Sequence, residues 1–340
     1  MKFISCASYY GTGSSAITDY VAEFNNVFSF TNEEFRFIQD PDGISDLEFN
    51  LVECFNRHNS GHAIKRYKKL VDFYNGNFFG KKYRAFFGDN WEKISYQYLN
   101  KLIDFKYHGW WQYDLYDKGN FFYFRKRIIN KLLHETIWRN KPERTFNSMK
   151  NEITYASHPS EEDFLKYTRQ YIEELFESVV PNEFDTIMVD QLLPPMNLPR
   201  YLRYFNKNIK VVIVDRDPRD LFILDKYVWQ DGIIPKDVKV FCQWYIYTRK
   251  HREYEDTNNS YVKLIKFEDL IYNYDETTYL LNKWLNLDEV NHVKKKQIFN
   301  PKKSMANTQV WLNYPEAKKE IEYISNNLSK YLYNFPRKDK

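Results

Sequence analysis

Short apolar runs alternate with segments of helical periodicity in the first and last parts of the chain. These runs are Phe3–Ala7, Phe35–Ile38, Thr186–Val189, Val211–Val214 and Tyr261–Ile265. Runs of this kind are typical of strands buried on both faces, and strands that alternate with helices indicate parallel pairing. The pattern predicts an α/β fold with a mainly parallel five-stranded sheet and flanking helices.

The region from about 45 to 180 follows a different pattern. Helical spacing predicts helices at His62–Asn75 and Ser160–Ser178, and the stretch between them is rich in Trp and Tyr. The same spacing predicts a final helix within residues 315–335. We therefore expect a single domain over residues 1–340 that contains a helical, aromatic-rich insertion.

The net charge and the cysteine content of the chain argue against several functional classes. The 340 residues carry a formal net charge of +4 and no long basic stripe, which argues against a nucleic-acid-binding protein. Cys6, Cys54 and Cys242 are widely spaced and form neither a disulfide framework nor a zinc pattern, which favours a reducing compartment. A membrane span needs about 18 consecutive apolar residues, and no window of the sequence approaches this length. The N-terminal residues lack the apolar segment of a signal peptide. We expect a soluble, cytoplasmic protein.

Two glycines stand in the first turn of the chain, KFISCASYYGTGSSAITDYV at residues 2–21. Gly11 and Gly13 separate the first apolar run from a helical pattern. Because a helix start offers free N–H groups and the positive end of the helix dipole, this turn is suited to binding an anion. A purely structural turn is the alternative. The P-loop of kinases requires a lysine where Ser14 stands, which argues against a kinase.

Charged residues follow the fourth and fifth apolar runs. The sequence R-D-P-R-D places Arg216 and Arg219 at the end of a predicted strand, where a guanidinium offers paired donors to a phosphate. Alternatively, the arginines pair with the neighbouring aspartates in a solvated turn. Glu268 and Asp269 follow the fifth run, and we interpret them as structural carboxylates.

The order of these three clusters resembles that of the sulfotransferases that use 3′-phosphoadenosine 5′-phosphosulfate (PAPS). The matching segments are the glycine turn, R-D-P-R-D at 216–220 and K-F-E-D-L at 266–270. Phe299–Pro315 is similar to the C-terminal phosphate-contact loop of that family. The resemblance covers roughly half of the chain and says little about the insertion. It implies a sulfotransferase fold of the P-loop NTPase-like kind.

The resemblance implies PAPS as the donor, 3′-phosphoadenosine 5′-phosphate (PAP) as the product, and no metal. It implies that one group of residues binds the 5′-phosphosulfate: Gly11, Thr12, Gly13, Ser14 and Ser15. It also implies that Arg216 binds the 3′-phosphate and that a second group closes over this phosphate: Lys302, Lys303 and Ser304. Arg219 occupies a position that either contacts the donor or only braces the turn.

Two positions depart from the pattern of the family. Gly11 stands where the family usually has Lys or Arg, a contact that contributes about 2–4 kcal/mol to transition-state stabilisation. Either another cation replaces this contact, with Arg36, Lys65 and Arg66 as the candidates, or the enzyme is slow or inactive. Leu224 stands where the family has a serine that contacts the 3′-phosphate, so this contact is missing, and Lys226 and Tyr227 are the candidates to replace it.

An acceptor hydroxyl needs a general base within hydrogen-bonding reach. Asp190 directly follows the apolar run at Thr186–Val189, where the resemblance places this base, and it is the first candidate. Its alternative role is to brace the turn that follows. His158 and His108 are further candidates, and an ordinary surface or core histidine is the alternative for each.

Aromatic residues make up 19% of the chain, and half of its eight tryptophans fall in one region: Trp91, Trp110, Trp111 and Trp138. Aromatic faces stack on sugar rings and equally on lipid or aromatic groups, whereas core packing is the alternative role. Arg125–Arg127 lies nearby and suits an anionic group. We predict a PAPS-dependent sulfotransferase whose acceptor-side insertion receives a hydroxyl of a glycan or glycolipid precursor. The alternatives are a sulfotransferase-like binding protein without turnover and a small-molecule kinase.

Overall fold

The structure is a computed structural model, and it describes three ranges of the chain: 1–76, 82–250 and 260–336. Contacts within the chain divide it into two compact units. The sheet unit comprises residues 1–40 and 176–340, and the helical unit comprises residues 41–175. Each unit has a core of its own.

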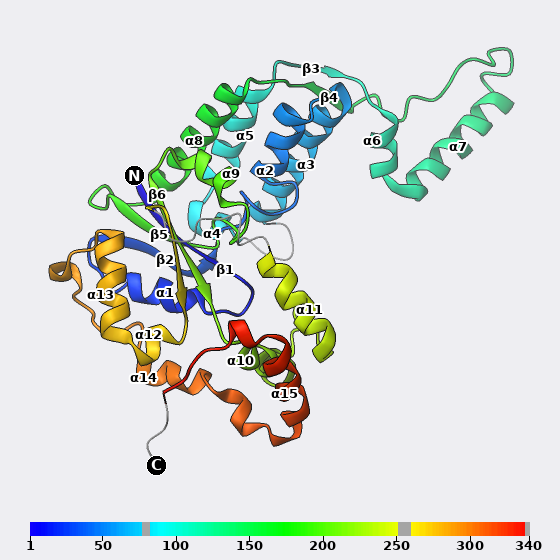
Figure 1. Cartoon of the computed structure of the whole chain (residues 1–340). Helices are drawn as coiled ribbons and strands as arrows, with labels where there is room; N and C mark the ends of the chain where they lie inside the picture. Colours follow the sequence, from blue (N-terminus) through cyan, green and yellow to red (C-terminus); the bar gives the residue numbers. More distant parts are fainter. Residues whose placement is uncertain (77–81, 251–259, 337–340) are drawn as a thin grey trace. The chain divides into compact units, whose positions relative to one another are not determined.

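The sheet unit is built on parallel strands: β1 (Lys2–Ser8), β2 (Val27–Glu34), β5 (Thr186–Asp190), β6 (Ile209–Asp215) and β7 (Val262–Lys266). Their order across the sheet is β2-β5-β1-β6-β7 (Figure 1). Each neighbouring pair is parallel. The predicted α/β class with a mainly parallel five-stranded sheet is confirmed.

The strand predicted at Phe35–Ile38 was wrong. The strand is Val27–Glu34, and the predicted run lies in the turn that follows it. Because β2 is an edge strand, its sequence VFSFTNEE does not need to be apolar throughout and shows no unbroken run. Phe35, Phe37 and Ile38 are fully buried in the turn, which explains why their sequence resembles that of a strand.

Helices surround this sheet: α1 (Ser14–Val21), α9 (Leu198–Leu202), α10 (Pro218–Ile223), α11 (Val238–Arg249), α12 (Asp269–Tyr272), α13 (Tyr274–Leu285), α14 (Pro301–Ser304) and α15 (Lys318–Asn327). One apolar cluster joins α1, α12 and α13 to the strands, and a second joins α10, α11 and α15. Helix α15 lies within the segment predicted to form the final helix.

The turn after β1 lies where the connections of the sheet change direction. Strand β1 has β5 on one side and β6 on the other. After β1, the chain forms β2 and β5 on one side of it and then crosses over to form β6 and β7 on the other side. In open parallel sheets, ligands bind beyond the carboxyl ends of the strands at such a point. The residues that follow β1, β5 and β6 therefore meet at this edge.

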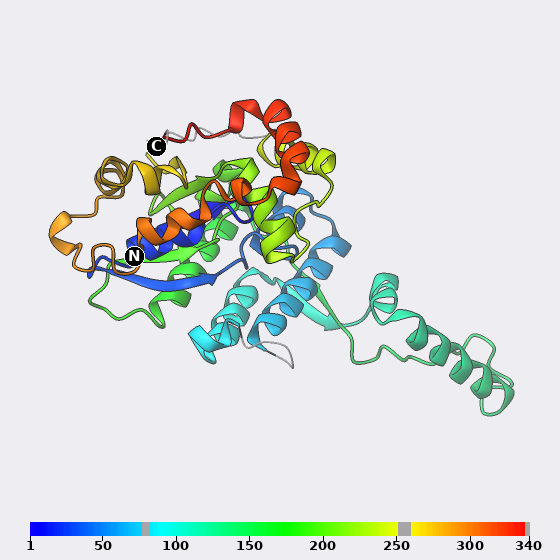
Figure 2. The same cartoon turned by 90° about the horizontal axis from the view of Figure 1, so that it is seen from below.

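The helical unit combines a pair of short antiparallel strands with helices. Its elements are α2 (Ile44–Glu48), α3 (Arg57–Asn75), α4 (Arg84–Phe87), α5 (Asn90–Leu102), β3 (Phe105–His108), α6 (Gln112–Asp117), α7 (Gly119–Glu135), β4 (Ile153–Ala156) and α8 (Glu161–Glu177). Trp91 is fully buried and donates from Nε1 to the carbonyl oxygen of Val71 at 2.8 Å, so it belongs to the core of this unit. Helix α7 lies apart from α3, α5 and α8 in both views (Figure 2).

Candidate functional site

The turn between β1 and α1 is shaped by its two glycines. Gly11 has φ +70° and Gly13 has φ +100°, both in the left-handed region that favours glycine. Gly13 is also the N-cap of α1, and the amides of Ser14 and Ser15 at the start of the helix have no acceptor within it. The turn therefore presents backbone N–H groups at the carboxyl end of β1, as an anion site requires. The Ser15 side chain is exposed.

Neighbouring side chains fill the space into which a side chain at position 11 would point. A Cβ atom on Gly11 would lie 2.8 Å from Leu221 Cδ1 and 2.8 Å from Trp229 Cζ3. A Cβ atom on Gly13 would lie 2.6 Å from the ring of Phe267. This packing is a physical reason why the chain has no Lys or Arg at position 11.

The hydroxyl groups of the turn are held by the protein. Thr12 is buried, and its Oγ1 lies 2.6 Å from the carbonyl oxygen of Tyr9 and 2.7 Å from that of Val214. The Thr12 side chain therefore fixes the turn to the end of β6, and the Thr12 backbone N–H donates to the carbonyl oxygen of Tyr9 at 3.1 Å. Ser14 Oγ donates to Asp190 Oδ2 at 3.1 Å.

Arg216 follows β6 and lies against the glycine turn. Its Nη1 donates to the carbonyl oxygen of Gly11 at 3.2 Å, and its Nη2 donates to that of Asn307. The guanidinium also lies 4.7 Å from the ring centroid of Phe267, and the residue is 3% exposed. Its Nε has no hydrogen-bond partner among the described residues, and no carboxylate in those ranges forms an ion pair with it. A buried guanidinium with unused donors is a site that an anion would complete.

The environment of Arg219 is different. Its Nε and Nη2 donate to the two carboxylate oxygens of Asp217 at 2.9 and 2.7 Å, and its guanidinium lies 4.1 Å from the ring centroid of Trp311. Glu268 Oε1 accepts from the backbone N–H of Asp217 at 2.8 Å. This network braces the turn, which is the structural role considered above for Arg219 and Glu268.

The segment that contains Lys302–Ser304 is fixed beside Arg216. The carbonyl oxygen of Asn307 accepts from the Arg216 guanidinium. The carboxylate of Asp220 holds the next turn by accepting from two backbone N–H groups at 3.0 and 2.6 Å: those of Gln309 and Val310. The two lysine side chains are exposed, and the serine is half-buried. Two segments with proposed phosphate contacts therefore meet at Arg216.

Asp190 ends β5 beside the start of α1. It is 3% exposed, its Oδ2 accepts from Ser14, and its Oδ1 has no hydrogen-bond partner among the described residues. Burial raises its pKa to about 7, and the negative charge of Glu34 adds to the shift. A carboxyl with a pKa near neutral and a free oxygen is suited to act as a general base.

The side chains expected to replace the missing cation have acidic partners. Arg36 Nε lies 2.9 Å from the carboxylate of Asp40. Lys65 and Arg66 belong to the helical unit, where acidic groups hold them at distances of 2.6 to 2.9 Å: Asp114, Glu152 and Asp42. The cation that the structure places at the glycine turn is Arg216.

The substitutes expected for the missing serine also have a partner. Leu224 is buried in the apolar cluster of α10 and α11 and begins a π-helical turn. Lys226 Nζ lies 2.6 Å from Glu320, and the Tyr227 hydroxyl lies 3.3 Å from the same carboxylate. Both side chains therefore contact α15.

The two candidate histidines lie in the helical unit. His108 is an exposed residue of β3. His158 is also exposed, and its ring stacks on Phe55 with centroids 3.7 Å apart. Their role as a base stays a prediction.

A cavity of about 330 Å³ in the helical unit is lined by residues of α3, β4 and the segment around Trp111. Three buried polar atoms of its lining residues have no hydrogen-bond partner among the described residues: His62 Nδ1, Trp111 Nε1 and Thr154 Oγ1. Burial lowers the pKa of His62, so its ring is neutral at pH 7. Aromatic surface combined with unused donors and acceptors suits a ligand rich in hydroxyl groups.

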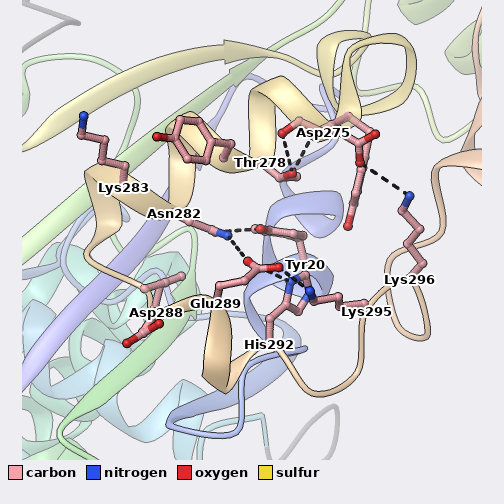
Figure 3. A pocket seen from close by; sticks show the side chains of 13 residues that line it. Tyr20, Asp275, Thr278, Asn282, Lys283, Asp288, Glu289, His292, Lys295 and Lys296 are labelled. Carbon is pink, nitrogen blue, oxygen red and sulfur yellow. Dashed lines mark hydrogen bonds and ion pairs between the residues drawn. The ribbon is translucent and has the colours of Figure 1, made fainter.

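A second cavity, of about 560 Å³, lies in the sheet unit along α13 (Figure 3). Charged side chains of its lining pair with one another: Lys296 Nζ lies 3.7 Å from Asp275, and Lys295 contacts Glu289. The lining includes neither the glycine turn nor Arg216. We assign this cavity no part in the candidate site.

Some contacts of the site leave little signal in the sequence. Asn307 contacts Arg216 through its backbone carbonyl, and Asp220 acts on backbone N–H groups, so neither contact depends on a recognisable motif. Gln191 has φ +53°, and its Nε2 donates to Ser14 Oγ at 3.4 Å. The position of Gln191 directly after β5 was the sequence signal that could have identified it as a residue of the site.

The described residues contain neither a membrane-spanning helix nor a cluster of metal-ligating side chains. No helix there combines the length and apolarity needed to cross a bilayer. Within the same three ranges, no group of three or more His, Cys, Asp or Glu is arranged to hold a metal ion.

No protein-family model matches the chain, and no curated protein matches its sequence. Among solved structures, the chain is similar to a sulfotransferase domain from the curacin biosynthetic pathway, with 12% identity, 98% of both chains covered and a TM-score of 0.41. It is also similar to retinol dehydratase in complex with androsterone and the inactive cofactor PAP, with 13% identity, 98% of this chain and 82% of that chain covered, and a TM-score of 0.37. Similarity at this level decides neither activity nor ligand, which depend on the geometry of the site itself.

Proposed function

We propose that the sheet unit binds PAPS and that the protein transfers the sulfuryl group of PAPS to a hydroxyl group of an acceptor. One observation carries this proposal: the Arg216 guanidinium donates to the carbonyl oxygen of Gly11 at 3.2 Å. The contact joins the glycine turn and the R-D-P-R-D turn into one site, although they are far apart in the sequence. These are two of the segments on which the resemblance to PAPS-dependent sulfotransferases rests.

The residues of the site fit the two anionic ends of PAPS. The amides of Ser14 and Ser15 and the positive end of α1 suit the 5′-phosphosulfate. The unused donors of Arg216, including the Nε that has no partner among the described residues, suit the 3′-phosphate. Lys302 and Lys303 are exposed on a segment attached to Arg216 and are free to close over the same phosphate.

PAPS supplies an activated sulfuryl group when it is bound. The residues of the chain then act mainly by positioning the reactants and neutralising charge, as in phosphoryl transfer. Asp190 accepts the proton of the acceptor hydroxyl at Oδ1, while Ser14 donates to Oδ2 and holds the carboxyl group in place. Its pKa of about 7 leaves a substantial carboxylate fraction at neutral pH.

We further propose that the acceptor is a glycan or a glycolipid precursor. The cavity of the helical unit supports this class of acceptor, because it combines the ring of Trp111 with polar atoms of His62 and Thr154 that no described residue contacts by a hydrogen bond. A sugar ring offers both an apolar face and hydroxyl groups to such a lining.

Calorimetric titration with PAP, and separately with ATP and Mg²⁺, tests the donor. We expect PAP to bind and ATP with Mg²⁺ to bind far more weakly. Binding of ATP with Mg²⁺ alone would replace the proposal with a kinase, and binding of neither nucleotide would contradict it. If PAP binds but no sulfated product forms with any glycan tested, a binding protein without turnover becomes the better description.

A further inference from the structure

Helix α7 exposes an apolar stripe. The helix has 17 residues, and none of them is buried. Phe121, Phe124, Ile128 and Leu132 are between 55% and 83% exposed. Their spacing of three, four and four positions places them along one face of the helix. A stripe of large apolar side chains in water is unfavourable, so it indicates a surface that something else covers.

Helix α7 and the residues that follow it up to position 144 concentrate the positive charge of the protein. Residues 119–144 contain seven Lys and Arg and two Glu, a net charge of +5, whereas the whole chain carries +4. The remaining residues therefore sum to −1. Several of these cations lie over aromatic rings: Arg125 lies 5.3 Å from the ring centroid of Phe122, and Arg144 lies 5.3 Å from that of Trp138.

The partner must therefore offer both an apolar layer and negative charge. A bilayer with anionic headgroups offers both, because an amphipathic helix places its apolar side chains below the headgroups and its Lys and Arg among them. A soluble polyanion would pair with the cations but leave the stripe in water. A second copy of this chain would bring the same positive segment and, outside it, a net charge of only −1.

We propose that α7 docks the protein onto the surface of an anionic membrane. Phe121, Phe124, Ile128 and Leu132 enter the outer acyl region, while Arg125, Lys131 and their basic neighbours contact the headgroups. The helix lies on the membrane and does not cross it, because its length and charge do not suit a span. This proposal does not depend on sulfuryl transfer, although a surface-bound enzyme would meet a lipid-linked acceptor readily.

Vesicle co-sedimentation of the full chain tests the proposal. Two vesicle types serve as probes: phosphatidylcholine alone, and an equal mixture of phosphatidylcholine and phosphatidylglycerol. We expect binding to the mixed vesicles only, and we expect it to weaken as the salt concentration rises. Absence of binding to the mixed vesicles would overturn the proposal.

Two variants separate the apolar and electrostatic contributions. The stripe variant carries Phe121→Ser, Ile128→Ser and Leu132→Ser, and the charge variant carries Arg125→Gln, Arg127→Gln and Lys131→Gln. Each is expected to bind mixed vesicles at least about tenfold more weakly. Because none of these side chains is buried, both should keep the far-ultraviolet circular dichroism of the wild type. Binding that persists in both variants would contradict the proposal.

A matched control and an independent readout complete the test. Phe73→Ser removes an aromatic side chain that is 66% exposed on α3 and should leave vesicle binding unchanged. Trp138 fluorescence should shift to shorter wavelength when mixed vesicles are added, and Trp138→Phe should remove that part of the shift. If light scattering instead shows a dimer that the stripe variant dissociates, without vesicle binding by the wild type, α7 is a protein interface and the membrane proposal is wrong.

Discussion

Arg216 and Arg249 are two buried arginines near the end of β6, and their surroundings differ. Arg249 donates from Nε and Nη2 to Asp215 Oδ1 at 3.1 and 2.8 Å, and both side chains are fully buried. Its guanidinium also lies 3.4 Å from the ring centroid of Tyr245. Arg216, by contrast, donates to two backbone carbonyls, and its Nε has no partner in the part of the chain that the structure describes.

We interpret this difference as one between a structural cation, Arg249, and a cation suited to bind a ligand, Arg216. The charge of Arg249 is neutralised by Asp215 within the fold. The Arg216 donors meet the carbonyl oxygens of Gly11 and Asn307, and among the described residues the carboxylates of Asp220, Glu268 and Asp217 act on its charge without forming an ion pair with it. The two residues have similar burial, and the identity of the partner distinguishes them.

Breaking the ion pair of Arg249 and Asp215 should have the largest effect on the stability of the protein. Arg249→Met leaves the Asp215 carboxylate buried without its main partner, and we expect the free energy of unfolding to fall by about 3–5 kcal/mol. Lys266, at 3.4 Å from the other carboxylate oxygen, offsets only part of this loss. Urea unfolding measures the change. A loss below about 1 kcal/mol would show that the pair is not structural.

The buried carboxyl group of Asp190 should make the stability of the protein depend on pH. The pKa of Asp190 is about 7 in the folded protein and near 4 in the unfolded chain, so the folded state holds a proton that the unfolded state releases between these values. Stability therefore decreases as the pH rises from about 4 to about 7 and is flat outside this window. Relative to Asp190→Asn, the wild type should lose about 2–4 kcal/mol across it. Parallel curves for the two proteins would contradict the burial of this group.

A substitution in the glycine turn should weaken PAP binding, and the change in free energy should be smaller than the two changes in stability above. Gly11→Ala adds a Cβ against Leu221 and Trp229 at a positive φ, and we expect PAP affinity to fall by about 1–3 kcal/mol. Gly232→Ala is the matched control, because Gly232 has φ +78° and no atom of the described residues lies within 4 Å of the added Cβ. It should reduce stability but leave PAP affinity unchanged. Equal PAP affinities for both variants and the wild type would argue against the turn as the 5′ site.

Substitution of the exposed Lys302 or Lys303 should have the smallest effect on PAP binding. Lys302→Ala and Lys303→Ala are each expected to weaken PAP binding by about 0.5–1 kcal/mol, because exposed charges are screened by water and salt. The difference should shrink as the salt concentration rises. A loss as large as that for Arg216→Gln would show that the segment closes over the ligand and buries these cations.

The sequence predicts those parts of the fold and site that depend on local patterns. The apolar runs of β1, β5, β6 and β7 are close to the observed strands, and the order of the charged turns led to Arg216. Strand β2 was missed because an edge strand has no unbroken apolar run.

Contacts between distant segments were not predictable in this way. Lys226 meets Glu320 of α15, and Arg216 meets the backbone of Asn307, and neither contact follows from residue type or spacing. Lys65 was a candidate cation until its pairing with Asp114 was visible, because sequence alone does not show which acidic group a lysine meets.

The central claim is that Arg216 is the receptor of a 3′-phosphate. Calorimetry with PAP and with adenosine 5′-monophosphate, which lacks that phosphate, tests it directly on the wild type, Arg216→Gln and Arg219→Gln. We expect the wild type and Arg219→Gln to prefer PAP, and Arg216→Gln to bind PAP on the order of 10²-fold more weakly and to lose the preference. A preference for PAP that survives in Arg216→Gln would contradict the claim.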